Sequence, residues 1–125
     1  RIALLDILIN NADRKAGHVL IEEGSETGDV PRLWGIDHGI CFHVEPKLRT
    51  VIWEFAGTPI PAEMKSELEA LRNRLADEAG VLAGVLGDLL SSVEIEALRR
   101  RLNRLIDRAV FPQPGAGRHY PWPPV

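Results

Sequence analysis

Residues 5–18 read LDILINNADRKAGH, and they join an apolar segment directly to a polar turn. Apolar residues between Ile2 and Ile9 recur at the spacing of one helical face, which predicts a helix that ends near Asn10 and Asn11. A loop from Asp13 to Gly17 then carries charged side chains. Folds often present functional groups on such a loop after a rigid element. We therefore expect the chain to be organised around this helix and loop.

Two short runs of strand-forming residues follow the polar loop, Val19–Ile21 and Leu33–Ile36. Residues 24–29 between them are dense in turn formers, so the pattern predicts an antiparallel hairpin. Such a hairpin would place Asp13 just before its first strand and Asp37 just after its second. We expect the two aspartates to meet at the same end of the hairpin.

The remaining chain is predicted to be a loop followed by helices. Residues 41–58 have no clean period and are interpreted as a loop with one short helical turn at most. Helical periodicity begins after Pro61, a short helix is expected over 81–90, and Ser91 with Glu94 forms a capping-box pattern before a third helix. The predicted fold class is α+β, a mainly helical lobe with a small antiparallel β-hairpin that carries the site.

The composition is that of an ordinary globular domain. The 125 residues are 45% hydrophobic with a net charge of -3, so no basic field exists to attract nucleic acid. The single cysteine, Cys41, cannot form an internal disulfide, which favours a reducing compartment, and we expect a cytoplasmic protein. No apolar run reaches the roughly 20 residues that a membrane-spanning helix needs, so no transmembrane segment is expected.

The charged residues near the hairpin suggest phosphate chemistry. Asp13 and Lys15 share one tight loop, which could supply an acceptor for a proton and a cation for a moving phosphate. Asp37 follows a strand and precedes Gly39, where a carboxylate could hold a hard divalent cation. The alternative is structural: both aspartates would then only shape turns at the ends of a helix and a strand.

Two other groups of residues were considered as sites. One group could bind zinc, but its spacing fits no tight zinc motif: His18, His38, Cys41 and His43. The basic run 99–101, with Arg104 and Arg108, could bind an anionic surface. Acidic residues share the same predicted helix, so a solvated helix face is the favoured interpretation.

The paired segments LDILINNADR (5–14) and IDHGICF (36–42) resemble motifs of the phosphatidylinositol 3-/4-kinase superfamily. The likeness is to type II phosphatidylinositol 4-kinases and their bacterial relatives, actinobacterial members included, and it covers about residues 4–61. It implies that residues 1–112 are a protein-kinase-like C-terminal lobe with a proline- and glycine-rich tail at 113–125. The implied parts are a catalytic loop 11–18, a metal loop 36–39, an activation segment 40–58 and a helical part 59–111.

The resemblance implies a role for each polar residue of the two motifs. Asp13 matches the catalytic-loop aspartate, and Arg14 and Lys15 complete the expected catalytic set. Asn11, His18 and Asp37 are the expected cofactor-binding residues, with Asp37 and His18 as metal ligands. His18 stands where the family has a metal-binding asparagine, so it also marks a departure from the family pattern. Asn11, together with Asp6, is further expected to brace the loop.

The activity implied by the resemblance is transfer of the γ-phosphate of ATP, with Mg²⁺ or Mn²⁺, to a lipid, protein or small-molecule acceptor. The sequence shows no glycine-rich loop and no strand-borne lysine of a nucleotide-binding N-terminal lobe. We expect that lobe to precede Arg1 and the present segment alone to be inactive. Two alternatives are a pseudokinase-type binding module, which His18 favours, and a helical interaction domain.

Overall fold

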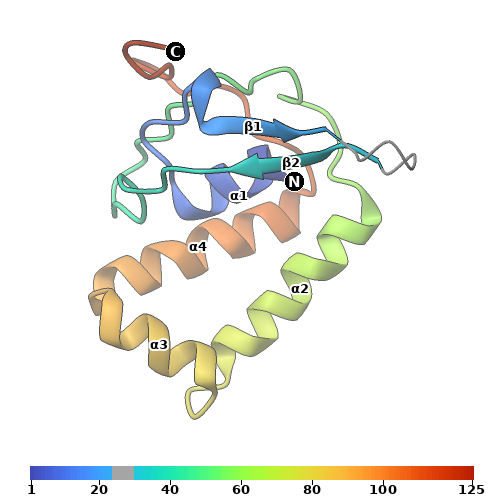
Figure 1. Cartoon of the computed structure of the whole chain (residues 1–125). Coiled ribbons are helices and arrows are strands. Elements are labelled where there is room, and N and C mark those ends of the chain that lie inside the picture. Colours follow the sequence, from blue (N-terminus) through green and yellow to red (C-terminus); the bar gives the residue numbers. More distant parts are fainter. Residues whose placement is uncertain (24–29) are drawn as a thin grey trace.

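The computed structural model describes residues 1–23 and 30–125, and the predicted turn at 24–29 lies outside them. Its class is α+β, as predicted, with a helical layer on one side and a two-stranded hairpin on the other (Figure 1). The elements in chain order are α1 (Ile2–Ile9), the 3-10 turn η1 (Ala16–His18), β1 (Val19–Glu22), β2 (Arg32–Gly35), α2 (Ala62–Ala76), α3 (Val81–Leu89) and α4 (Ser92–Arg108).

The core lies where α1, α2 and α4 meet, because each helix buries one apolar stripe there. Leu68 and Leu75 of α2 lie two turns apart and are both buried, and Leu102 of α4 is only 1% exposed. The buried cluster consists of Ala3, Leu4, Leu8, Ile60, Leu68, Leu75, Leu98, Leu102, Leu105, Ile106 and Phe111. This core holds α1 rigidly and therefore fixes where the polar loop after it begins.

The ends of the helices follow local side-chain chemistry. Asn10 closes α1 with φ 56°, a left-handed conformation that asparagine tolerates. Ser91 and Glu94 form the predicted capping box at the start of α4. The helix α2 ends at Ala76, and Gly80 immediately precedes α3.

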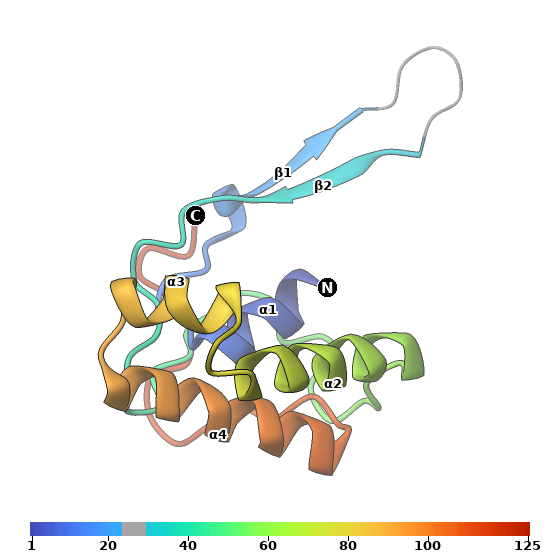
Figure 2. The ribbon, with the colours of Figure 1, turned by 90° about the horizontal axis from the view of Figure 1, so that it is seen from below.

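The hairpin is antiparallel, as predicted, with Val19 opposite Gly35 and Leu20 opposite Trp34. It extends away from the helices, so much of its apolar surface is uncovered (Figure 2). Ile21 is 68% exposed and Leu33 61% exposed. Trp34 is also exposed, and its indole N–H donates to Glu22.

The long loop and the C-terminal segment complete the fold through backbone hydrogen bonds. Residues 41–58 form a loop, as expected, and Thr50 makes a parallel bridge with Arg14. The proline- and glycine-rich tail 113–125 folds back onto this loop, and Pro121 in it is buried. No helix in the described ranges has the length and apolar character needed to cross a membrane.

Candidate functional site

A buried ion pair anchors the loop between α1 and β1 (residues 11–18, the α1–β1 loop). Asp6 and Arg14 are both fully buried. The Arg14 Nε atom donates to both carboxylate oxygens of Asp6, at 3.1 and 2.9 Å, and the Asn11 amide donates to the same carboxylate at 3.0 Å. A buried charge pair is tolerated only when its remaining donors are satisfied. The next contacts of Arg14 meet that condition.

Arg14 also joins the two ends of the hairpin base. Its Nη1 atom donates to the carbonyls of His18, at 3.1 Å, and Ile36, at 2.7 Å. Its Nη2 atom lies 2.8 Å from Nε2 of His38. Because a guanidinium only donates, His38 accepts there and is neutral at that nitrogen. One side chain therefore fixes the entry to β1 and the exit from β2 relative to α1.

The residues that the sequence assigned to one candidate site differ in burial. Arg14 was predicted to be catalytic and Asn11 to bind a cofactor, but both side chains are buried and committed to contacts within the protein. We therefore assign Arg14 and Asn11 to positioning the loop, the bracing role that the resemblance also gave to Asn11. Asp6 and Asn11 brace the loop as expected, since the Asn11 carbonyl oxygen also accepts from the Asp13 amide.

Asp13 and Lys15 are the partly exposed members of the loop. Their side chains are 29% and 21% exposed, and the Lys15 Nζ atom lies 3.5 Å from Asp13 Oδ2. Asp13 and Lys15 are partly exposed and Arg14 between them is buried, because the backbone around Arg14 is extended and pairs with Thr50. The loop thus presents an acceptor and a cation side by side.

Asp37 and His18 form the second half of the site. The Nε2 atom of His18 lies 3.5 Å from Asp37 Oδ2, and Asp37 has a left-handed backbone with φ 54°. The Nδ1 atom of His18 faces the backbone N–H of Lys15 at 3.5 Å. A neutral histidine that accepts at Nδ1 carries its proton on Nε2. His18 therefore points a donor at Asp37 in this arrangement.

The structure pairs His18 with Asp37 and Lys15 with Asp13, but within the described residues Asp13 and Asp37 share no hydrogen bond. Within residues 1–23 and 30–125, no three histidine, cysteine or acidic side chains are placed to hold a metal ion together. Burial raises the pKa of Cys41 to about 11, so this residue is a thiol at neutral pH.

Sequence reasoning missed several residues that hold the site in place. The Asn10 amide donates to the carbonyls of His43 and Glu45, and its oxygen accepts from the Lys47 amide. Arg101 of α4 donates to the Leu8 carbonyl at 2.8 Å. Asparagine at a helix end was a visible signal for Asn10, because asparagine tolerates the left-handed cap. Nothing local distinguished Arg101 from the arginines beside it.

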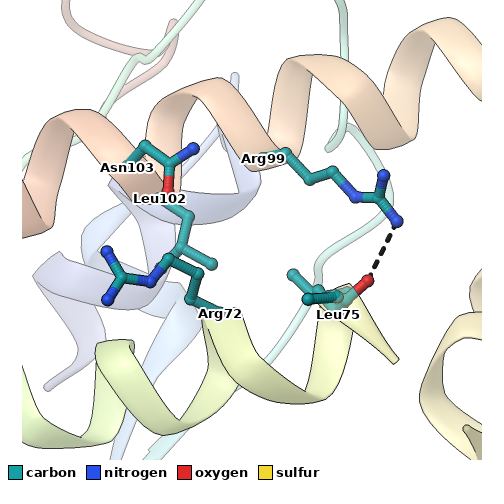
Figure 3. A pocket seen from close by; sticks show the side chains of 6 residues that line it. Arg72, Leu75, Arg99, Leu102 and Asn103 are labelled. Carbon is teal, nitrogen blue, oxygen red and sulfur yellow. Dashed lines mark hydrogen bonds between the residues drawn. The ribbon is translucent and has the colours of Figure 1, made fainter. Parts of the chain in front are cut away.

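The basic run on α4 is only partly the solvated face that the sequence favoured. Arg100 is exposed, with only a 3.9 Å contact to Glu96, whereas Arg99 donates to the carbonyl of Leu75 at 2.9 Å (Figure 3). This bond crosses a hollow of about 190 Å³ between α2 and α4. Arg99 thus binds the last turn of α2, as Arg101 binds that of α1.

An open cleft of about 690 Å³ lies beside the α1–β1 loop, between the hairpin and the long loop. Its lining is mostly apolar and includes Ala16, Val19, Leu33, Ile52 and Phe55. Ala16 directly follows Lys15, so the cleft borders the candidate site.

Comparison with known proteins gives two relatives. The chain is 45% identical over 123 residues to protein Rv2133c of Mycobacterium tuberculosis. The aligned region covers 98% of this chain and 41% of that protein. It is 32% identical over 74 residues to phosphatidylinositol 4-kinase gamma 3 of Arabidopsis thaliana, which covers 57% of this chain and 13% of the kinase. The chain therefore spans less than half the length of either relative. No protein-family model and no solved structure matches it.

Proposed function

We propose that the chain is the C-terminal lobe of a phosphotransferase of the phosphatidylinositol 3-/4-kinase type. Such an enzyme moves the γ-phosphate of ATP to a hydroxyl of a lipid, protein or small molecule. The partial similarity to a plant phosphatidylinositol 4-kinase supports the proposal. The observation that carries it is the buried Asp6–Arg14 pair, which ties the loop of Asp13 and Lys15 to both ends of the hairpin base.

Asp13 and Lys15 have complementary tasks in the proposed reaction. Phosphoryl transfer depends mainly on positioning and on compensating negative charge. Asp13 would orient the acceptor hydroxyl and accept its proton at a carboxylate oxygen. Lys15 would exchange its present contact with Asp13, at 3.5 Å, for a contact with the transferred phosphate. Arg14 would contact neither the acceptor hydroxyl nor the transferred phosphate. Its role is to hold the backbone between Asp13 and Lys15.

Asp37 fits the divalent metal that accompanies ATP. Mg²⁺ commonly takes one or two protein carboxylates together with phosphate oxygens and water. Asp37 is 59% exposed at the end of the hairpin and offers such a carboxylate. His18 directs Nε2 at Asp37, so we assign it to orienting the carboxylate rather than to binding Mg²⁺ itself. When bound, Mg²⁺ would offset phosphate charge.

The exposed apolar side chains of the hairpin support a further part of the proposal, an N-terminal lobe that covers them. A two-stranded hairpin is stable mainly through packing against another element. Leu20, Ile21, Leu33 and Trp34 are all exposed in the described structure. In the proposed enzyme, that lobe would supply most nucleotide contacts, and dependence on ATP would place the protein in the cytoplasm.

The decisive experiment is titration of the intact protein with ATP in the presence and absence of Mg²⁺ or Mn²⁺. We expect metal-dependent binding, and we expect Asp37→Asn to weaken it by about 10-fold or more. Asp107→Asn on the exposed side of α4 is the matched control and should leave binding unchanged. Absence of metal-dependent binding would refute the proposal. Binding that survives Asp37→Asn unchanged would refute the site assignment.

The contact between His18 and Asp37 favours one competing function, a non-catalytic binding module. A histidine that holds the carboxylate competes with the metal for it. Substituting His18→Asn supplies an amide oxygen in place of the imidazole. In an active enzyme this substitution should tighten Mg²⁺-dependent ATP binding or leave it intact. A non-catalytic module would bind its partner equally well after Asp13→Ala, and the intact protein would transfer no phosphate.

A further inference from the structure

The last residues of the chain, 118–125, lie against the α1–β1 loop. The carbonyl of Pro124 accepts a hydrogen bond of 2.9 Å from the Ala16 amide, directly after Lys15. The carbonyl of His119 accepts from the Thr50 amide at 3.1 Å and from the Trp53 indole at 3.0 Å. The end of the chain lies close to the start of β1 in both views (Figures 1 and 2).

These bonds complete a three-layer arrangement of irregular backbone. The α1–β1 loop bonds to residues 49–51, where the Arg14 amide donates to the Arg49 carbonyl and the Val51 amide donates to the Arg14 carbonyl. Residues 49–51 then bond outward to the C-terminal segment through Thr50. The C-terminal segment contacts both inner layers, so it clamps the loop to the segment beneath it.

The composition of the segment suits this role. Three of its residues are prolines, Pro121, Pro123 and Pro124, which offer carbonyl acceptors but no N–H donors. Such a segment can satisfy exposed amides of a neighbouring loop without leaving donors of its own unpaired. Pro121 is buried, and the ring of His119 packs edge-on to Trp53 with centroids 6.0 Å apart. The contact is thus built from side chains as well as backbone.

We propose that residues 118–125 are a positioning strap for the candidate site, which holds Lys15 in place through the Ala16 amide. The strap's relevance to phosphoryl transfer rests on the proposed function, whereas its mechanical effect does not. Removing the strap should loosen residues 14–16 and 50–53 while the helical core stays intact.

Amide hydrogen exchange followed by NMR tests the strap in the full chain and in a chain that ends at Gly117. We expect the Ala16 and Thr50 amides to exchange about 10-fold faster without the strap. Core amides of α4, such as that of Leu102, should not change. Equal exchange at Ala16 and Thr50 in both chains would overturn the proposal. A uniform acceleration across the whole molecule would also overturn it, because that outcome indicates only global stabilisation.

Point variants keep the test valid if the shortened chain does not fold. Trp53→Phe keeps an aromatic ring at this position but removes the indole N–H that donates to the His119 carbonyl. This variant should accelerate exchange of the Thr50 amide several-fold. Gly115→Ala is the control, because a Cβ there meets no atom within 4 Å. Unchanged exchange at Thr50 in Trp53→Phe would contradict the strap.

Metal-dependent ATP binding, measured on the intact protein and on its Trp53→Phe variant, separates the two proposals. Faster exchange without any ATP binding supports the strap and refutes the proposed function. Intact ATP binding with unaltered exchange supports the proposed function and refutes the strap.

Discussion

Arg14 is the residue on which the α1–β1 loop depends. Its guanidinium is fully buried, yet each of its three nitrogens has a partner: Nε binds Asp6, Nη1 binds two carbonyls, and Nη2 binds Asp6 and His38. Burying a charge pair is costly unless its hydrogen-bonding groups are satisfied in this way. The arrangement leaves Asp13 and Lys15, on either side of it, free to face outward.

Substitution of Asp6 tests this dependence. Asp6→Asn would leave the Arg14 charge buried without its counterion, and we expect the free energy of unfolding to fall by about 3–5 kcal/mol. Urea denaturation measures the loss. The double substitution Asp6→Leu with Arg14→Met removes both charges and should cost less than Asp6→Asn alone. A double variant that is no more stable than Asp6→Asn would show that the pair is not the cause.

At the scale of elements, α4 has a capped first turn and a buried apolar stripe. Its first turn is fixed locally, because the Glu94 carboxylate accepts from the amide and the hydroxyl of Ser91. Its buried stripe then packs on α1 and α2. Hydrogen bonds from Ser91 lower the pKa of Glu94 below its ordinary value of 4.5. The capping box therefore links the stability of this helix to pH.

The direction of that pH dependence follows from the lowered pKa. Ionised Glu94 favours the folded state above 4.5, and this contribution is lost as the pH falls through the lower folded-state pKa. We expect Glu94→Ala to lower the urea midpoint at neutral pH and to have a smaller effect in acid. Parallel urea titrations at both pH values measure the difference. If Glu94→Ala lowered the urea midpoint equally at both pH values, the loss would come from helix propensity and not from the ionised cap.

At the scale of the whole molecule, α4 is also the support that connects the helical layer to the candidate site. Arg101 donates to the Leu8 carbonyl at the end of α1 and, at 3.2 Å, to the His43 carbonyl in the long loop. Burial lowers the pKa of Arg101, which is the cost of placing this charge at the junction. Its side chain links α4 to residues that lie 93 and 58 positions earlier in the sequence.

Arg101→Met removes these two bonds while keeping an apolar stem. We expect the free energy of unfolding to fall by about 1.5–3 kcal/mol, the usual range for hydrogen bonds from a charged group. Arg100→Met, one residue away and exposed, is the matched control and should change stability by less than about 0.5 kcal/mol. Thermal or urea unfolding distinguishes them. Equal losses in the two variants would contradict the role given to Arg101.

Much of the fold was visible in the sequence because the interactions that form it are local. Helical periodicity located α1, α2 and α4, the Ser91–Glu94 pattern located the start of α4, and two β-branched or apolar runs located the hairpin. The resemblance to the kinase motifs also identified Asp6 and Asn11 as braces of the polar loop. The helices and the capping box depend on residues within a few positions of one another, and the hairpin joins two neighbouring segments, so a sequence pattern records them.

Only the tertiary structure decided which polar residues face outward and what holds them. Asp13, Arg14 and Lys15 are equally polar in the sequence, but the buried carboxylate of Asp6 draws Arg14 inward. The partners of Arg14, Arg101 and Ala16 include carbonyls of Ile36, Leu8 and Pro124. Every residue carries the same carbonyl, so no side-chain pattern identifies which one will be bound. The chain alone thus specified the helices, the hairpin and the polar loop, whereas long-range packing determined the orientation of the site and the course of the C-terminal segment.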